Sequence, residues 1–247
     1  MPVSVIVDSL IKPGVLAPDC ENSYTLFDRK ITLPGNNIMQ KLIWIFDYVS
    51  PYCYLQFHQL KTFCQEQELE IEYRPLLFAG LLKHWGQLGP AEIEGKRLHT
   101  FRYTLWLARK RGLPMRYPEA HPFNPLPLLR LTIALDNNPV LIEALFDLVW
   151  RQGQLPDEDN LAHIVSRFSD ASLQELTGRA EVKQILANNG RSAIEKRVFG
   201  VPTCIVNDEC LWGDDSLDML LDYLAEPTLF EDEEMQRLKN LPSAAQR

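Results

Sequence analysis

A short turn between an apolar run and a helical segment constrains this chain more than any other feature. Residues 42–46 are apolar and rich in residues that favour strands, which predicts a buried β-strand. The segment from Tyr52 to Gln65 predicts a helix, and Pro51 suits its first turn, where a missing N–H costs nothing. Ser50 therefore lies at the N-terminus of a helix that follows a buried strand.

This turn resembles the active-site turn of thioredoxin-like proteins, but the expected Cys-x-x-Cys is replaced by Ser-Pro-Tyr-Cys at residues 50–53. A hydroxyl cannot perform disulfide exchange, yet at a helix N-terminus it can hydrogen-bond a thiolate that a ligand brings. The substitution therefore points to glutathione chemistry. Two alternatives stay open: Ser50 is only a helix cap, and Cys53 is either a small buried hydrophobe or a monothiol redox group.

Composition excludes several functional classes. The 247 residues are 46% hydrophobic, and a formal net charge of −8 argues against a nucleic-acid partner. No apolar run approaches the roughly 20 residues of a membrane helix, and no signal-peptide pattern is present, so we expect a cytoplasmic protein without a membrane partner. The histidines and cysteines show no ligand spacing, so no metal site is predicted.

The cysteine pattern also argues against a disulfide near the C-terminus. Asn207-Asp208 is typical of a two-residue hairpin turn between two short strands. In that register Cys204 faces Leu211, and Cys210 lies on the opposite face of the hairpin from Cys204. A Cys204–Cys210 disulfide is therefore not expected.

The order of the predicted elements indicates an α/β fold with an insertion. The strand at 42–46 and the following helix lead to an alternating strand at Leu69–Pro75, which predicts a parallel pair with a right-handed crossover. A long helical region follows before the hairpin and a closing helix at Asp215–Leu224. Its predicted helices are Glu92–Arg111, Leu126–Leu135, Val140–Gly153, Glu158–Phe168 and Ser172–Asn189.

These elements divide the chain into four parts. Residues 41–78 and 198–225 form the sheet domain, and 79–197 are its helical insertion. Residues 1–40 form an extension of unknown role, which contributes a strand or hairpin from Tyr24 to Leu33. Residues 226–247 form a tail with an exposed helix.

Three separated places must converge if the fold is thioredoxin-like. Ser50 is the first, and the second is Val201-Pro202, an X-Pro bond before an apolar strand that suits a cis proline. The backbone N–H and C=O of Val201 are expected to pair with the cysteinyl residue of glutathione like an added strand. The third is the start of the last helix, where Asp215 takes the γ-glutamyl ammonium while Ser216 and helix N–H groups take its carboxylate.

At this point the chain resembles the 2-hydroxychromene-2-carboxylate isomerase family, which is related to kappa-class glutathione transferases and to the DsbA-like thioredoxin branch. Its motifs occur in family order over roughly residues 41–225. They are Asp47-Tyr48-Val49-Ser50-Pro51-Tyr52, Arg74-Pro75-Leu76-Leu77, Gly95-Lys96-Arg97, His121-Pro122-Phe123-Asn124, Phe199-Gly200-Val201-Pro202-Thr203 and Leu211-Trp212-Gly213-Asp214-Asp215.

The resemblance implies a DsbA-like fold with a large helical insertion and a glutathione cofactor. It places Ser50 on the glutathione sulfur, Lys96 on the terminal carboxylate of the tripeptide, and backbone contacts at Val201-Pro202. Gln87 stands where the family often has Asn and keeps an amide on a longer side chain. Two alternatives stay open for the charged residues: Lys96 is only part of the solvated surface, and Asp215 only caps the last helix.

The implied function is a glutathione-dependent isomerase that acts on a small aromatic or conjugated substrate, with a homodimer as a possible assembly. A kappa-like glutathione transferase, a DsbA-type oxidoreductase and a non-catalytic thioredoxin-like binding module are the alternatives. The missing first cysteine, with Ser50 in its place, counts against the oxidoreductase.

Overall fold

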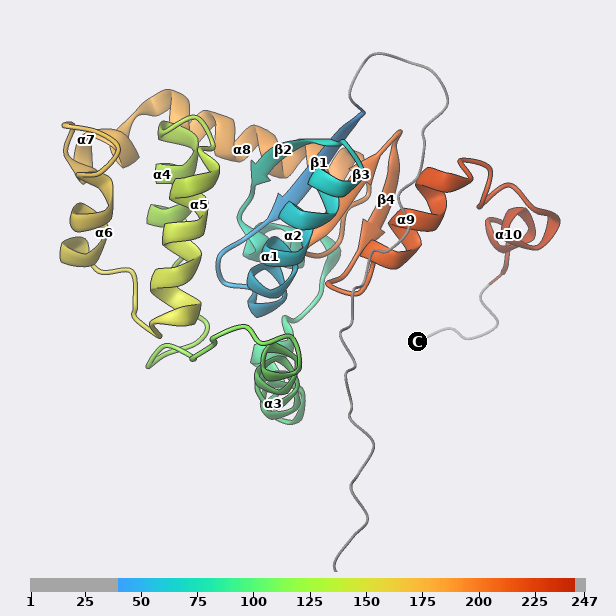
Figure 1. Ribbon diagram of the computed structural model, residues 1–247, viewed down its shortest axis with the longest axis horizontal. Coiled ribbons are helices and arrows are strands. Elements are labelled where there is room, and N and C mark those ends of the chain that lie inside the picture. The colour runs from blue at the N-terminus through green and yellow to red at the C-terminus, as the bar shows by residue number, and fades with distance from the viewer. Residues whose placement is uncertain (1–39, 243–247) are drawn as a thin grey trace, which may run out of the picture.

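A four-stranded mixed sheet forms the centre of the computed structural model, which describes residues 40–242 (Figure 1). Its order is β2-β1-β3-β4. Strand β1 (Lys41–Phe46) pairs in parallel with β2 (Glu70–Pro75) and antiparallel with β3 (Thr203–Val206). Strand β4 (Glu209–Trp212) closes the sheet as an antiparallel hairpin with β3. The predicted strands at both ends of the domain are therefore confirmed.

The predicted hairpin register is also confirmed. Cys204 pairs with Leu211, and Asn207 and Asp208 form the turn with φ of 49° and 71°. Cys204 is buried while Cys210 is exposed, and both thiols are free. Strand alternation thus separates the two cysteines, as expected from the sequence.

Helix α1 (Pro51–Glu66) connects β1 to β2 and buries Phe57, Leu60 and Phe63. The elements between β2 and β3 form the helical insertion, and Figure 1 shows α4 to α7 gathered at one side of the sheet while α8 runs back to it. These elements are α2 (Phe78–Trp85), η1 (Pro90–Glu92), α3 (Glu94–Lys110), α4 (Leu126–Ala134), α5 (Pro139–Phe146), η2 (Asp147–Arg151), α6 (Glu158–Val165), α7 (Leu173–Gly178) and α8 (Ala180–Glu195).

Two predicted helices are divided in the structure. The segment Ser172–Asn189 forms two helices instead of one, because Gly178 ends α7 and Arg179 is extended before α8 begins. The segment Val140–Gly153 is α-helical only through Phe146 and then forms the π-helical turn η2.

Two helices follow the sheet. Helix α9 (Leu217–Ala225) begins two residues later than predicted, so Asp215 lies in the preceding turn. Helix α10 (Glu233–Leu238) confirms an exposed helix in the tail. The expected hairpin at Tyr24–Leu33 lies outside the described residues. Within residues 40–242, no helix is long and apolar enough to cross a membrane.

Phe146 of α5 joins the insertion to the sheet domain. Its ring lies 4.6 Å from that of Tyr48, 5.4 Å from Phe57 and 5.9 Å from Phe46, measured between centroids. All of these side chains are fully buried. The two parts of the chain therefore share one aromatic core.

Truncating this shared ring is expected to destabilise the whole protein. Phe146→Ala should lower the free energy of unfolding by about 3–5 kcal/mol, the usual loss for a buried aromatic ring. Urea denaturation followed by circular dichroism measures this. Val140→Ala on the same helix removes an exposed side chain and should cost less than about 0.5 kcal/mol. Equal effects of the two changes would contradict a shared core.

Candidate active site

The sheet brings four segments to one end of the domain. Because β1 and β2 are parallel, both run towards this end, and Phe46 pairs with Pro75 there. The antiparallel strands place the start of β3 and the end of β4 at the same end, since Thr203 pairs with both Ile45 and Trp212. The turns that precede α1, β3 and α9 therefore converge, as the sequence predicted.

Ser50 lies at the N-terminus of α1, with Pro51 in the first turn as predicted. Its side chain is the N-cap: Oγ accepts a hydrogen bond from the Cys53 N–H at 3.4 Å. The residue is only 7% exposed. The hydroxyl thus lies where unpaired helix N–H groups create positive potential, which favours a bound anion.

Cys53 is fully buried behind this cap. Burial raises the pKa of its thiol far above the usual range. The thiol therefore stays protonated and shielded, which confirms the prediction of a small buried side chain and disfavours a redox role.

Asp47 holds the turn that carries Ser50. Its buried carboxylate accepts hydrogen bonds from the N–H of Val49 at 3.1 Å and from the N–H of Phe78 at 2.8 Å. The second bond ties the turn to the start of α2. Burial raises the Asp47 pKa to about 7, although the backbone hydrogen bonds oppose this shift.

Insertion side chains hold the same turn from the other side. The Trp150 indole N–H donates to the Tyr48 carbonyl at 2.8 Å, and His121 Nε2 lies 2.8 Å from the Val49 carbonyl. Because a carbonyl only accepts, His121 Nε2 must carry the proton. Burial lowers the pKa of His121, which favours the neutral imidazole, although the hydrogen bond to the Val49 carbonyl opposes this shift. The position of Ser50 thus depends on the insertion as well as on the sheet.

The Val201-Pro202 loop lies beside this turn, and its peptide bond is cis, as predicted. Within residues 40–242, the backbone N–H and C=O of Val201 make no hydrogen bond. The Pro202 carbonyl accepts from the Gly213 N–H at 3.0 Å, which ties this loop to the turn before α9. Val201 is 6% exposed, and its unpaired donor and acceptor are the groups through which an extended peptide adds to a sheet edge.

The turn before α9 presents one carboxylate and hides its other polar groups. Asp215 is exposed, whereas Asp214 and Ser216 are buried. The Ser216 hydroxyl donates to the Gly213 carbonyl at 2.8 Å. Asp215 is therefore the side chain of this turn that is open to a ligand, while the Ser216 hydroxyl is engaged inside the protein.

Lys96 lies in the first turn of α3 and is exposed. Thr100 and Tyr103 follow it at i+4 and i+7, so the three share one helix face. The Tyr103 ring lies 6.4 Å from the Tyr52 ring. Because Tyr52 belongs to the first turn of α1, Lys96 lies on the face of α3 that meets the N-terminus of α1.

Gln87 follows the left-handed Gly86 that ends α2, and it is exposed. The Trp85 indole N–H donates to the Val198 carbonyl at 2.9 Å. This bond brings the end of α2 to the segment that leads into Val201. Among the residues that the structure describes, no hydrogen bond joins Gln87 to the other predicted site residues.

Sequence reasoning missed the ion pair between Arg111 and Asp214. Two Arg111 nitrogens donate to the two Asp214 oxygens, each at 2.8 Å. The sequence signal was the doublet Asp214-Asp215, of which only one member was assigned a role. Their separation of 103 positions along the chain hid the pairing.

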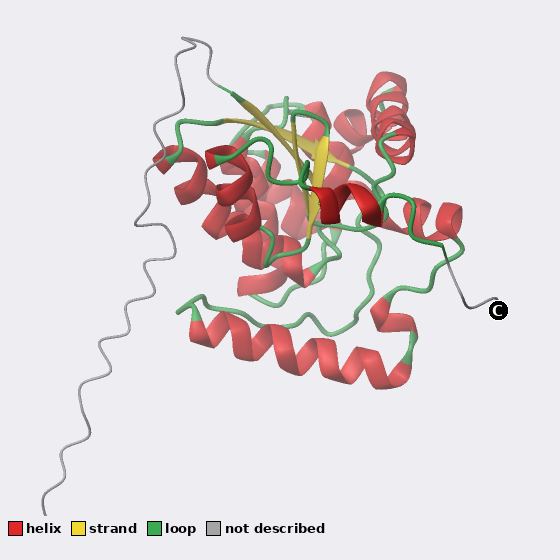
Figure 2. Cartoon of the chain, turned by 90° about the vertical axis from the view of Figure 1, so that its right-hand side faces the viewer, coloured by secondary structure: helices red, strands yellow, loops and turns green. Residues whose placement is uncertain are grey.

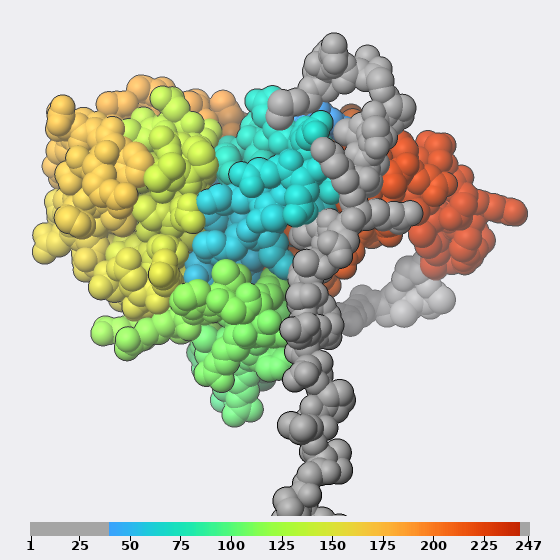
Figure 3. Space-filling model, in the orientation of Figure 1, coloured from blue at the N-terminus to red at the C-terminus, as the bar shows by residue number. Residues whose placement is uncertain are grey.

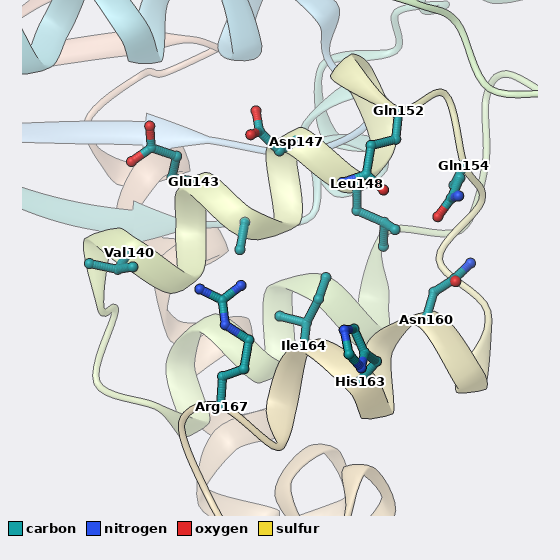
Figure 4. A pocket seen from close by; sticks show the side chains of 11 residues that line it. Val140, Glu143, Asp147, Leu148, Gln152, Gln154, Asn160, His163, Ile164 and Arg167 are labelled. Carbon is teal, nitrogen blue, oxygen red and sulfur yellow. The ribbon is translucent and has the colours of Figure 1, made fainter.

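A cavity of about 490 Å³ lies elsewhere, between α5, η2 and α6 (Figure 4). None of the predicted site residues lines it, so it is separate from the converging turns. It is lined by Val140, Glu143, Ala144, Asp147, Leu148, Gln152, Gln154, Asn160, His163, Ile164 and Arg167. Within residues 40–242, no group of three or more His, Cys, Asp or Glu side chains is placed to hold a metal ion.

Comparison with known proteins agrees with this fold. Residues 41–225 match the DSBA-like thioredoxin domain, so the chain belongs to that family. A 2-hydroxychromene-2-carboxylate isomerase of Pseudomonas putida is 28% identical, over 71% of this chain and 89% of that protein. Glutathione S-transferase kappa 2 of Caenorhabditis elegans is 27% identical, over 79% of this chain and 95% of that protein.

A solved structure of a 2-hydroxychromene-2-carboxylate isomerase shares the fold. Its TM-score is 0.67 at 23% identity, and the match covers 82% of this chain and 100% of that structure. The predicted DsbA-like α/β fold with a helical insertion is thus confirmed. The resemblance to these isomerases and to kappa-class transferases is confirmed as well, and both groups of relatives are named as enzymes.

Asp47 should make stability depend on pH in a specific window. Its folded pKa of about 7 exceeds the unfolded value of about 3.9, so folding favours the protonated form. The stabilisation from that proton is complete below about pH 4, falls as pH rises and is gone above about pH 7. The free energy of unfolding of the wild type should therefore fall relative to that of Asp47→Asn across this window.

Urea denaturation at a series of pH values measures this difference. Asp170→Asn, a change at an exposed aspartate, is the matched control and should follow the wild-type profile. Parallel curves for the wild type and Asp47→Asn would contradict a buried carboxyl with a raised pKa.

Proposed function

We propose that this protein is a glutathione-dependent isomerase of small aromatic or conjugated molecules. The observation that carries this is the convergence of the Ser50 hydroxyl, at a helix N-terminus, with the unpaired backbone groups of Val201. The relatives named as isomerases and as glutathione transferases support the same class of chemistry.

The residues present fit glutathione. Val201 offers a donor and an acceptor for the cysteinyl backbone, and Ser50 offers a hydroxyl for the sulfur. Lys96 in α3 and Asp215 in the turn before α9 are both exposed and carry opposite charges. We assign Lys96 to the glycyl carboxylate and Asp215 to the γ-glutamyl ammonium.

The role of Ser50 follows from its position. Its O–H donates to the sulfur, and the N-terminus of α1 adds favourable potential, so the thiolate is stabilised over the thiol by about 1–3 kcal/mol. This corresponds to roughly one or two pKa units. When bound, glutathione supplies a thiolate that adds reversibly to a conjugated double bond and so permits rotation about it.

Two of the alternatives fit the site less well. A DsbA-type oxidoreductase needs a reactive first cysteine, whereas Ser50 occupies that position and Cys53 is buried. A non-catalytic binding module does not require a hydroxyl at the helix N-terminus. A kappa-like transferase uses the same thiolate, and the Caenorhabditis elegans relative supports it. A homodimer stays a prediction.

Glutathione titration by calorimetry in two buffers of different ionisation enthalpy tests the proposed cofactor. We expect saturable binding with a buffer-dependent heat, because a proton leaves the thiol on binding. The bound protein is then tested with a conjugated enone for isomerisation and with an aryl halide for conjugation. Conjugation without isomerisation would favour the transferase, and binding without proton release would contradict thiolate activation.

Ser50→Ala should separate catalysis from folding and binding. We expect glutathione affinity within a few-fold of the wild type and turnover lower by about tenfold, because the Ser50 share of the thiolate stabilisation, about one pKa unit, is lost while the helix N-terminus remains. The control is Ser166→Ala, which removes an exposed hydroxyl and should leave turnover unchanged. Full turnover in Ser50→Ala would remove Ser50 from the mechanism.

A further inference from the structure

Two neighbouring aspartates in the turn before α9 have opposite environments. The Asp214 side chain is 5% exposed and receives both hydrogen bonds of the Arg111 guanidinium, whereas Asp215 is exposed. Burial raises the pKa of Asp214, and Arg111 opposes this shift. The turn therefore buries one aspartate side chain and exposes the next, although the two side chains are chemically identical.

The other hydrogen bonds that hold this turn do not determine which of the two aspartates is buried. The Gly213 N–H donates to the Pro202 carbonyl at 3.0 Å, and the Gly213 carbonyl accepts from Gln56 Nε2 at 2.6 Å. Both bonds fix Gly213, the residue before the two aspartates. Its φ of 111° is a value that glycine adopts readily. Arg111 is the contact that draws one specific carboxylate inward.

We propose that Arg111 is a positioning residue for the ammonium-binding end of the site: by holding Asp214 inside, it leaves Asp215 as the outward carboxylate that takes the γ-glutamyl ammonium. This inference rests on the proposed function, since it assigns the ligand's head group to that same site. Arg111 itself does not contact the ligand.

The ion pair also joins the two parts of the chain that carry the charged ends of the site. Arg111 directly follows α3, and Lys96 lies in the first turn of that helix. Figures 2 and 3 show α3 projecting from the body, and only Thr104, Leu107 and Ala108 of the helix are buried. Arg111 lies at the opposite end of α3 from Lys96, so its bidentate pair acts on the turn before α9 and not on the lysine.

Affinities for two ligands test this role. Glutathione carries the γ-glutamyl group, and the dipeptide cysteinylglycine lacks it. We expect the wild type to prefer glutathione, and Arg111→Met to reduce this preference by about tenfold or more, the loss of one charge-assisted contact. Its affinity for cysteinylglycine should stay near the wild-type value.

A rescue variant separates orientation from charge. In Arg111→Met/Asp214→Leu an apolar pair replaces the buried ion pair, a change that proteins often tolerate. Leucine stays inside because it is apolar, so Asp215 stays outward and the preference for glutathione should return. Lys61→Met is the matched control: it removes the 2.7 Å Lys61–Glu143 ion pair between α1 and α5 and should leave the preference unchanged.

Carbodiimide labelling with peptide mapping gives a readout that needs no ligand. We expect label on Asp215 but not Asp214 in the wild type, and on both in Arg111→Met. The positioning role would be overturned if Arg111→Met kept the wild-type labelling and the wild-type preference for glutathione. It would also be overturned if this variant lost affinity for both ligands equally. If the wild type binds no glutathione but the labelling changes as expected, the proposed function fails while Arg111 still sets the orientation of the doublet.

Discussion

The site depends on a buried carboxylate next to a helix N-terminus. Asp47 accepts the N–H groups of Val49 and Phe78, and so fixes the path of the chain between β1 and α1. A buried acceptor with two backbone donors is costly to replace, because either donor left unpaired loses about 1–3 kcal/mol. The hydroxyl of Ser50 is therefore presented by a turn with little freedom to move.

The insertion completes this support. Trp150 and His121 bind the carbonyls of Tyr48 and Val49, and Phe146 packs against the same turn through the Tyr48 ring. A site held by packed side chains from two parts of the chain is preorganised, and such a site stabilises charge without first rearranging. The helical insertion thus helps to position the Ser50 turn as well as to form the hydrophobic core.

The sequence predicted those features that local patterns control. The N-cap at Ser50 follows from residue type and the strand before it, and the register of Cys204 against Leu211 follows from a two-residue turn. The convergence of the turns followed from the order of strands and the family motifs. What stayed hidden depends on tertiary contacts: the break at Arg179, the His121–Val49 bond and the ion pair of Arg111. Ligand roles for Lys96 and Asp215 remain predictions that rest on placement.

The pKa of the glutathione thiol in the complex tests the central claim most directly. It can be followed by the ultraviolet absorbance of the thiolate as pH is raised, with free glutathione measured alongside. A site that stabilises the thiolate should lower this pKa by roughly one or two units from a free value near 8.5, and Ser50→Ala should recover part of the shift. A bound thiol that titrates like free glutathione would contradict the account.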